Sequence, residues 1–206
     1  MLLSPGFSIA GLAGIAIALV IGLTFHEFSH AFVADQLGDH RPRALGRVSL
    51  NPLRHIDPFG AILFLLVGFG YARPVPVNPY ALRPGRIGMA MVAAAGPIAN
   101  VVVALVLAIV FRSIRISGLR VDFVEAVVYY GVLYNFVLAI LNLIPIPPLD
   151  GYNVVLAFLP PRYAFTVQRY AQYGFFLLLL LIFIPGSPLG RLLGLAVPLA
   201  GLAIGA

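Results

Sequence analysis

Long apolar runs are the feature that most constrains what this chain can fold into. Phe7 to Phe25 contains no charged residue, and further apolar runs cover Gly88 to Phe111 and Val121 to Leu143. A membrane-spanning helix needs about 20 such residues. Only 10% of the residues are charged, against about a quarter in ordinary soluble domains. The chain is therefore a membrane protein. A cleaved signal peptide is a competing interpretation of the first run, disfavoured because no basic residue precedes it.

Two more apolar runs close the chain, Tyr170 to Ile184 and Leu189 to Ile204, and predict a C-terminal helical hairpin. We expect an all-α polytopic membrane protein, a helical bundle of about five spanning helices. It forms a single domain over residues 1–206, with a core at about 6–151 and the hairpin at about 164–204. The first helix continues past Phe25 until Gly38 can end it.

Three segments between these helices are irregular. Phe59 to Ala72 is apolar but short for a crossing, which favours a re-entrant or half-depth segment. His40 to Pro58 is rich in Arg and Pro and indicates an interfacial segment, and the partial alternation in Arg43 to Leu50 allows a short interfacial strand. Arg73 to Arg86 holds four prolines and must be extended.

The polar composition narrows the chemistry. Cysteine is absent, so any metal site must use His, Asp or Glu. All 13 basic residues are Arg. With so little polar surface they indicate interfacial anchoring to the lipid bilayer, and we expect no nucleic-acid partner.

The first helix carries the pattern H-E-x-x-H at His26, Glu27 and His30. Residues four apart lie one helical turn apart, so both imidazoles can reach one ion while Glu27 serves as general base. A purely structural role for the two histidines leaves Glu27 as an unpaired carboxylate among apolar residues, which is costly. The pattern is typical of a zinc hydrolase.

A catalytic zinc site needs a third protein ligand. Helix length brings Asp150 and Asn142 to the same membrane face as the motif, if the helix before them runs parallel to the first. Asp150 is therefore the favoured ligand, and Asn142 can donate to a substrate carbonyl or a developing oxyanion. Glu125 belongs at the opposite face. Second choices are His40, His55 and Asp57. For Asn100 we expect a plain interhelical hydrogen bond.

Five motifs occur in a fixed order between Thr24 and Gly151. They are HEFSH (His26 to His30), GRVSLNPLRHIDPFG (Gly46 to Gly60), ARPVPVNP (Ala72 to Pro79), AGPIAN (Ala95 to Asn100) and NLIPIPPLDG (Asn142 to Gly151). In these motifs the chain resembles the site-2 protease family of intramembrane zinc metalloproteases, in its small bacterial and archaeal branch.

The resemblance implies three core spans with flanking helices. It also implies one Zn²⁺ per chain, with His26, His30 and Asp150 as ligands, Glu27 as catalytic base and Asn142 as an accessory catalytic and substrate-binding residue. The function is then peptide hydrolysis within or just beneath the bilayer surface, on a single-span or membrane-anchored protein.

A substrate helix hides its peptide bonds and must unwind locally before cleavage. An extended segment such as Pro74 to Pro79 or Leu45 to Leu50 can pair with the exposed backbone, which makes Val75 and Val77 candidate substrate-binding residues. The alternative function is a non-enzymatic membrane metal transporter that uses the same histidines. Transport predicts polar residues on several helices, whereas the last two are almost purely apolar, and it needs no general base at Glu27.

Arginine distribution predicts the orientation. If Phe59 to Ala72 is re-entrant, nine Arg lie on the side of the H-E-x-x-H motif and four on the other. The nine are Arg41, Arg43, Arg47, Arg54, Arg73, Arg83, Arg86, Arg162 and Arg169. The positive-inside rule then places the active site toward the cytoplasmic face of the cell membrane, with the N-terminus outside.

Overall fold

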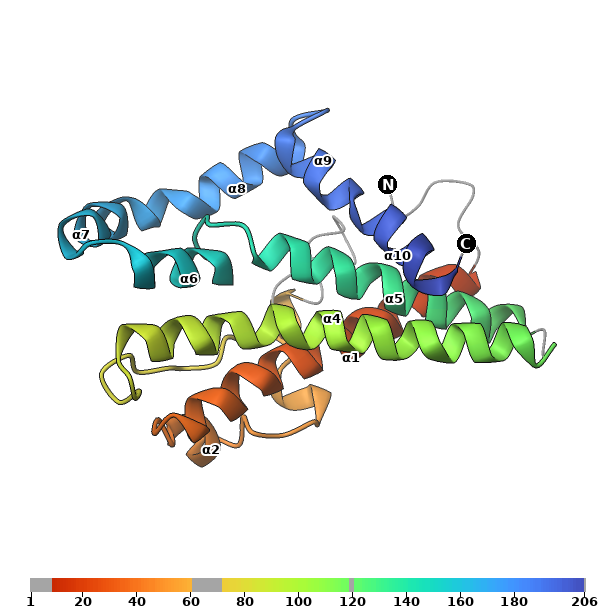
Figure 1. Ribbon diagram of the computed structural model, residues 1–206, viewed down its shortest axis with the longest axis horizontal. Helices are drawn as coiled ribbons and strands as arrows, with labels where there is room; N and C mark the ends of the chain where they lie inside the picture. Colours follow the sequence, from red (N-terminus) through yellow and green to blue (C-terminus); the bar gives the residue numbers. More distant parts are fainter. Residues whose placement is uncertain (1–8, 61–71, 119–120, 206) are drawn as a thin grey trace.

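A computed structural model describes residues 9–60, 72–118 and 121–205 of this chain. Three long helices form its centre: α1 (Ile9–Gln36), α4 (Arg86–Ile116) and α5 (Asp122–Asn142), each packed against the other two. Helices α1 and α5 run in the same direction and α4 runs opposite to them (Figure 1). The parallel arrangement assumed for the first helix and the helix before Asp150 is therefore correct.

Local sequence explains where these helices begin and end. Gly38 adopts a φ of 107°, a conformation that favours glycine, just beyond the end of α1. Asp122 and Glu125 occupy the first turn of α5, where acidic residues complement the helix dipole. Helix α4 runs on through Pro97 and extends to Ile116, beyond the expected end at Phe111.

The C-terminal part differs in detail from the expected hairpin. Its elements are α6 (Asp150–Phe158), α7 (Pro161–Tyr170), η2 (Ala171–Tyr173), α8 (Gly174–Phe183), α9 (Pro188–Gly194) and α10 (Ala196–Ile204). The first apolar helix thus begins nine residues before the expected Tyr170, at Pro161. The second is divided at Leu195, because Pro198 lacks the N–H that would bond the carbonyl of Gly194 and its ring crowds that carbonyl.

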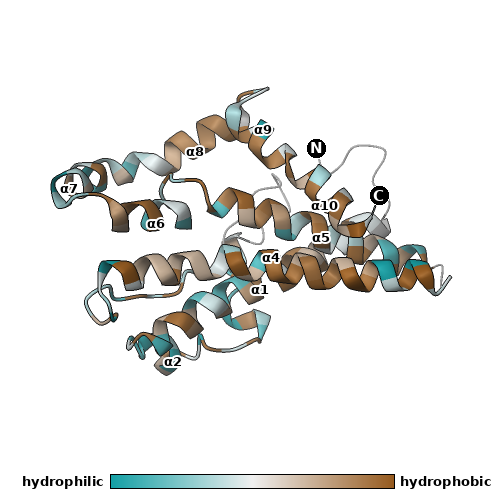
Figure 2. Ribbon diagram, in the orientation of Figure 1, coloured by the Kyte–Doolittle hydropathy of each residue, from teal (hydrophilic) through white to brown (hydrophobic). Residues whose placement is uncertain are grey.

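Four helical stretches in the described residues are long and apolar enough to cross a membrane: Gly11–Gln36, Arg86–Ile116, Asp122–Asn142 and Pro161–Ile182. Pro188–Ile204 is apolar but shorter. Apolar residues cover most of the length of α1, α4, α5 and α8, whereas hydrophilic ones gather around α2, at α7 and at the C-terminal end of α4 (Figure 2). The expected all-α polytopic membrane fold is confirmed, with four long helices and a shorter fifth.

Close packing joins α4, α5 and α10. Their buried contact consists of Ala104, Ala108, Val132, Phe136, Ala196 and Ala200. Four of the six are alanines, whose small side chains let membrane helices approach closely. Helix α10 therefore covers one side of the α4–α5 pair. The site forms toward the C-terminal ends of α1 and α5.

The interfacial segment after α1 is held by ion pairs. Arg43 donates to the Asp35 carboxylate, at 2.6 Å for the shortest contact, and Arg41 makes two hydrogen bonds of 2.9 Å to Asp39. The short strand that the alternation in Arg43 to Leu50 allowed is not formed: α2 (Arg41–Ala44) has Pro42 in its first turn, and Gly46, at a φ of 69°, turns the chain. Beyond it lies η1 (Pro52–Arg54).

One isolated antiparallel bridge, between Ile56 and Ala72, is the β-type pairing found in the described part of this region. The re-entrant segment expected over Phe59 to Ala72 lies outside the described residues at 61–71. The single-domain boundaries stay a prediction.

Candidate metal centre and active site

Helix α1 presents His26, Glu27 and His30 toward the interior of the bundle, and all three are buried. The Nε2 atoms of His26 and His30 lie 3.0 Å apart, as expected for side chains one helical turn apart. Gly96 of α4 faces them so closely that a Cβ there would lie 2.5 Å from His30 Nε2 and 2.6 Å from His26 Nε2. Only glycine leaves room for both imidazoles at this crossing.

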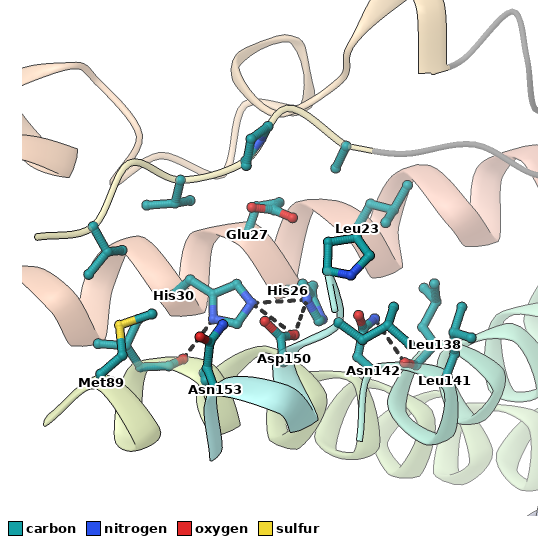
Figure 3. Close-up of a pocket in the computed structure, with 18 of the residues that line it drawn as sticks. Leu23, His26, Glu27, His30, Met89, Leu138, Leu141, Asn142, Asp150 and Asn153 are labelled. Atoms are coloured by element: carbon teal, nitrogen blue, oxygen red, sulfur yellow. Dashed lines mark hydrogen bonds and ion pairs between the residues drawn. The ribbon is translucent and has the colours of Figure 1, made fainter. Parts of the chain in front are cut away.

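Asp150 reaches the same point from the start of α6 (Figure 3). Its Oδ2 lies 3.1 Å from His26 Nε2 and 3.3 Å from His30 Nε2. The turn that presents it depends on Gly151, where a Cβ would overlap the carbonyl oxygen of Leu143. At the other end of α6, Arg86 of α4 donates hydrogen bonds to the carbonyls of Leu156 and Leu159 and holds the helix in place.

Hydrogen bonds on the far side of each imidazole fix which nitrogen carries the proton. His30 Nδ1 lies 2.7 Å from the carbonyl oxygen of Val92, which can only accept, so Nδ1 donates. His26 Nδ1 lies 2.6 Å from Asn100 Oδ1, and the Nδ2 group of Asn100 already donates to Asn135 and to the carbonyl of Gly22. Both Nε2 atoms are therefore left with lone pairs that face Asp150.

Three lone-pair donors at this separation fit a metal ion. Without a cation between them, two neutral imidazole nitrogens and a carboxylate oxygen repel one another. Asp150 Oδ2 is also buried, and no residue in the described part of the chain donates a hydrogen bond to it. Ligands at about 2.05 Å around tetrahedral zinc are about 3.3 Å apart, close to the separations of 3.0 to 3.3 Å seen here. The group His26, His30 and Asp150 can thus hold zinc.

A cavity of about 520 Å³ opens onto this group (Figure 3). Glu27 lines it and makes no hydrogen bond or ion pair within the described part of the chain, so its carboxylate is available to a water molecule. Most of the remaining wall is apolar, including Leu23, Met89 and Phe175. A buried carboxylate beside a metal group, in a cavity that water can enter, provides what general-base hydrolysis needs.

The candidate substrate-binding residues also line this cavity. Asn142 lies at the end of α5, and its Nδ2 donates to the carbonyl of Leu138 at 3.0 Å. Val75 and Val77 belong to the extended segment on the opposite wall. The structure thus brings all seven sequence-predicted site residues to one cavity, while their roles stay proposals.

Buried Arg47 holds the extended segment in place. Its guanidinium donates to the carbonyls of Arg54, Arg73 and Pro74, the last two within that segment. Burial lowers the pKa of Arg47, although the carbonyl groups around it accept its hydrogens. From the sequence alone, Arg47 was used only in the positive-inside count. The neighbouring residues in the sequence do not indicate that this side chain is buried.

The second-choice ligands lie elsewhere. His40 pairs with Asp35 at 3.0 Å, and His55 donates from Nε2 to the carbonyl of Ser49. Asp57 accepts hydrogen bonds from the backbone N–H groups of residues 59 and 60. Glu125 lies 3.5 Å from Arg115. None of these four side chains lines the cavity.

Sequence reasoning missed the support behind His26. Asn100 does make interhelical hydrogen bonds, as expected, but one of its partners is the imidazole of a candidate metal ligand. Asn135 of α5, fully buried, completes the chain of hydrogen bonds. A polar residue in the middle of each apolar run was the available sign, since such residues seek partners in membranes.

Fold and site together define a polytopic membrane protein with a buried group of two histidines and a carboxylate that can hold a metal, beside the carboxylate of Glu27. Comparison with known proteins makes this specific. The model of peptidase family M50 matches residues 114–183. No solved structure matches the chain with significance.

Three curated relatives cover most of the chain. The "Putative zinc metalloprotease YwhC" of Bacillus subtilis is 35% identical over 176 residues, 83% of this chain and 80% of the relative. The "Putative zinc metalloprotease Rip2" of Mycobacterium tuberculosis H37Rv is 31% identical over 84% of this chain and 69% of the relative. The "Putative zinc metalloprotease MJ0611" of Methanocaldococcus jannaschii is 31% identical over 73% of each.

This chain belongs to peptidase family M50, the site-2 protease family. The resemblance drawn from its motifs is confirmed, and so is the expected function of an intramembrane zinc metalloprotease with zinc as its metal. It is a multi-pass membrane protein.

Proposed function

We propose that this chain is a zinc metalloendopeptidase that hydrolyses peptide bonds of single-span or membrane-anchored proteins at the bilayer. One observation carries the proposal: His26 Nε2, His30 Nε2 and Asp150 Oδ2 converge within 3.3 Å beside Glu27, whose carboxylate forms no ion pair with any residue that the structure describes. Zinc held there supplies a Lewis acid that acidifies a water molecule and polarises the scissile carbonyl.

Glu27 acts as general base and then as general acid. Its carboxylate removes a proton from the attacking water while the new carbon–oxygen bond forms at the scissile carbon. The same carboxyl group then gives that proton to the amide nitrogen as the carbon–nitrogen bond breaks. Because Glu27 has no competing ion pair in the described part of the chain, it is free for both transfers.

Substrate binds along the extended segment. Arg47 fixes this segment through its carbonyls and leaves Val75 and Val77 facing the cavity. An unwound stretch of substrate satisfies its own backbone groups by pairing with such a segment. Asn142, at the opposite wall, contributes an amide group to the bound chain.

Zinc analysis and a cleavage assay test the assignment together. The purified chain should hold one zinc ion, and Asp150→Asn should lower that stoichiometry. Glu27→Gln should keep zinc and abolish cleavage of a model single-span substrate, because an amide cannot accept the proton. Glu125→Gln is the matched control, since Glu125 lies outside the cavity near Arg115. Full cleavage by Glu27→Gln would disprove its role as base.

The orientation is also a proposal: the active site lies toward the cytoplasm. It is supported by the excess of Arg on the motif's side of the membrane. The chain has no cysteine, so single cysteines can be introduced and labelled. Ser117→Cys should react with an impermeant thiol reagent in intact cells and Ser49→Cys should not. The reverse pattern would overturn the orientation.

A further inference from the structure

A peptide bound in the cavity presents main-chain carbonyl oxygens that need hydrogen-bond donors, and few side chains in the cavity can donate. Its hydrophilic side chains are His26, Glu27, His30, Asn142, Asp150 and Asn153. The N–H groups of both histidines point away from the cavity, to Asn100 and to Val92. Ionised carboxylates only accept. Among the side chains that the structure describes in this cavity, two amides therefore remain as donors.

The two amides differ in how far they are already engaged. Asn142 donates from Nδ2 to the carbonyl of Leu138, in the preceding turn of its own helix. Asn153 is half-buried and makes no hydrogen bond or ion pair within the part of the chain that the structure describes, and the same cavity wall includes the apolar residues Met89 and Leu178. No residue of the described chain occupies this amide, so its N–H groups are free to donate to a molecule bound in the cavity.

Asn153 is also placed at the metal group. It follows Asp150 by three residues on α6, so the two side chains project from the same face of that helix. Figure 3 shows Asn153 beside His30, whereas Asn142 lies on the other side of Asp150. The two amides thus flank the metal ligands, one toward each end of the cavity.

We propose that Asn153 is a substrate-binding residue that donates its side-chain N–H to a main-chain carbonyl oxygen of the bound peptide, on the His30 side of the metal. This rests on the proposed function, because it needs a peptide at the metal. It assigns to Asn153 the contact that the sequence pattern suggested for Asn142 alone. The substrate chain then meets one amide donor on each side of the metal ligands, Asn142 on one side and Asn153 on the other.

Two hydroxamate probes test this contact apart from zinc binding. Acetohydroxamic acid has only the metal-binding group, whereas the hydroxamate of N-acetyl-Leu-Leu adds main-chain carbonyls that Asn153 can reach. Asn153→Leu keeps the size of the side chain and removes the donor. We expect it to bind acetohydroxamic acid and zinc as the unchanged protein does, and to bind the peptidyl hydroxamate about tenfold more weakly, as for one lost hydrogen bond.

Further variants keep the test independent of folding. Asn153→Gln retains an amide donor and should recover part of the lost affinity, while Val155→Leu makes the same helix more apolar at an exposed position outside the cavity and should change nothing. In a cleavage assay, kcat/KM of Asn153→Ala should fall at least tenfold with zinc retained.

Three results would overturn the inference. Unchanged peptidyl-hydroxamate binding by Asn153→Leu would show that no carbonyl is bound there. Equal weakening of both probes would mean that Asn153 supports the metal site instead. If the unchanged protein bound neither zinc nor acetohydroxamic acid, the proposed function would fail, and this inference with it.

Discussion

Gly96→Ala offers the sharpest test of the metal geometry. The new methyl carbon would lie 2.5 Å from His30 Nε2 and 2.6 Å from His26 Nε2, whereas ordinary contacts lie at 3.4 Å or more. The difference between 3.4 and 2.5 Å requires His30 Nε2 to move by about 0.9 Å. Zinc sites tolerate ligand displacements of only about 0.2 Å.

This displacement should be far larger than zinc binding can absorb. Losing a single supporting hydrogen bond behind a ligand costs 10- to 100-fold in metal affinity, and here both imidazoles must move. We therefore expect the zinc affinity of Gly96→Ala to fall at least about 100-fold, or about 2.7 kcal/mol. Proteolysis at limiting zinc should fall in parallel.

Competition with a fluorescent zinc chelator measures this affinity in detergent. Gly194→Ala is the matched control, because a Cβ at Gly194 meets no heavy atom within 4 Å. Thermal unfolding of both variants after zinc removal separates damage to the fold from damage to the site. We expect the metal-free Gly96→Ala protein to unfold no lower than the control. In the absence of metal the imidazoles can rotate away from the methyl group, and alanine favours helix over glycine by about 1 kcal/mol.

The result that refutes this reasoning is equally specific. A Gly96→Ala protein that binds zinc within threefold of the unchanged chain would show that the imidazoles do not converge at this crossing. A metal-free variant that unfolds far below the control would place the damage in the helix packing instead.

Two further predictions concern groups that support the site. Asn100→Ala should weaken zinc 10- to 100-fold without abolishing cleavage at saturating zinc, because His26 Nδ1 loses its acceptor; metal titration against activity checks this. Hydrogen bonds from Arg41 hold the pKa of Asp39 at about 2, below its unfolded value near 3.9, so its stabilising effect is present above pH 4 and lost as pH falls toward 2. The opening free energy of the Asn78 backbone N–H, which donates to Asp39, should then fall by up to about 2 kcal/mol at low pH, as measured by hydrogen exchange after division by the intrinsic exchange rate at each pH, and Asp39→Asn should remove that dependence.

Much of the site follows from the sequence because its geometry is local. The spacing of His26 and His30 fixes them on one helical face, and counting residues along two parallel helices brings Asp150 to the same depth. The membrane fold follows from hydropathy in the same way. These inferences need only the rise and periodicity of a helix.

Helix ends were harder to predict from the sequence. The break at Leu195 depends on Pro198 acting on a carbonyl one turn earlier, and the helix at Pro161 begins within a segment of mixed polarity. Both are local effects that an average over apolar residues does not resolve. The turn around Gly46, where a strand was expected, has the same origin.

Tertiary structure alone decided which residues support the metal ligands. Lipid and the protein interior are both apolar, so hydropathy does not say which face of a membrane helix meets its neighbour. The contacts of Asn100 with His26, of Gly96 with both imidazoles and of Arg47 with the extended segment depend on how α1, α4 and the interfacial loop are rotated against one another. That rotation is set by side-chain packing between segments far apart in the chain, which periodicity within one segment cannot encode.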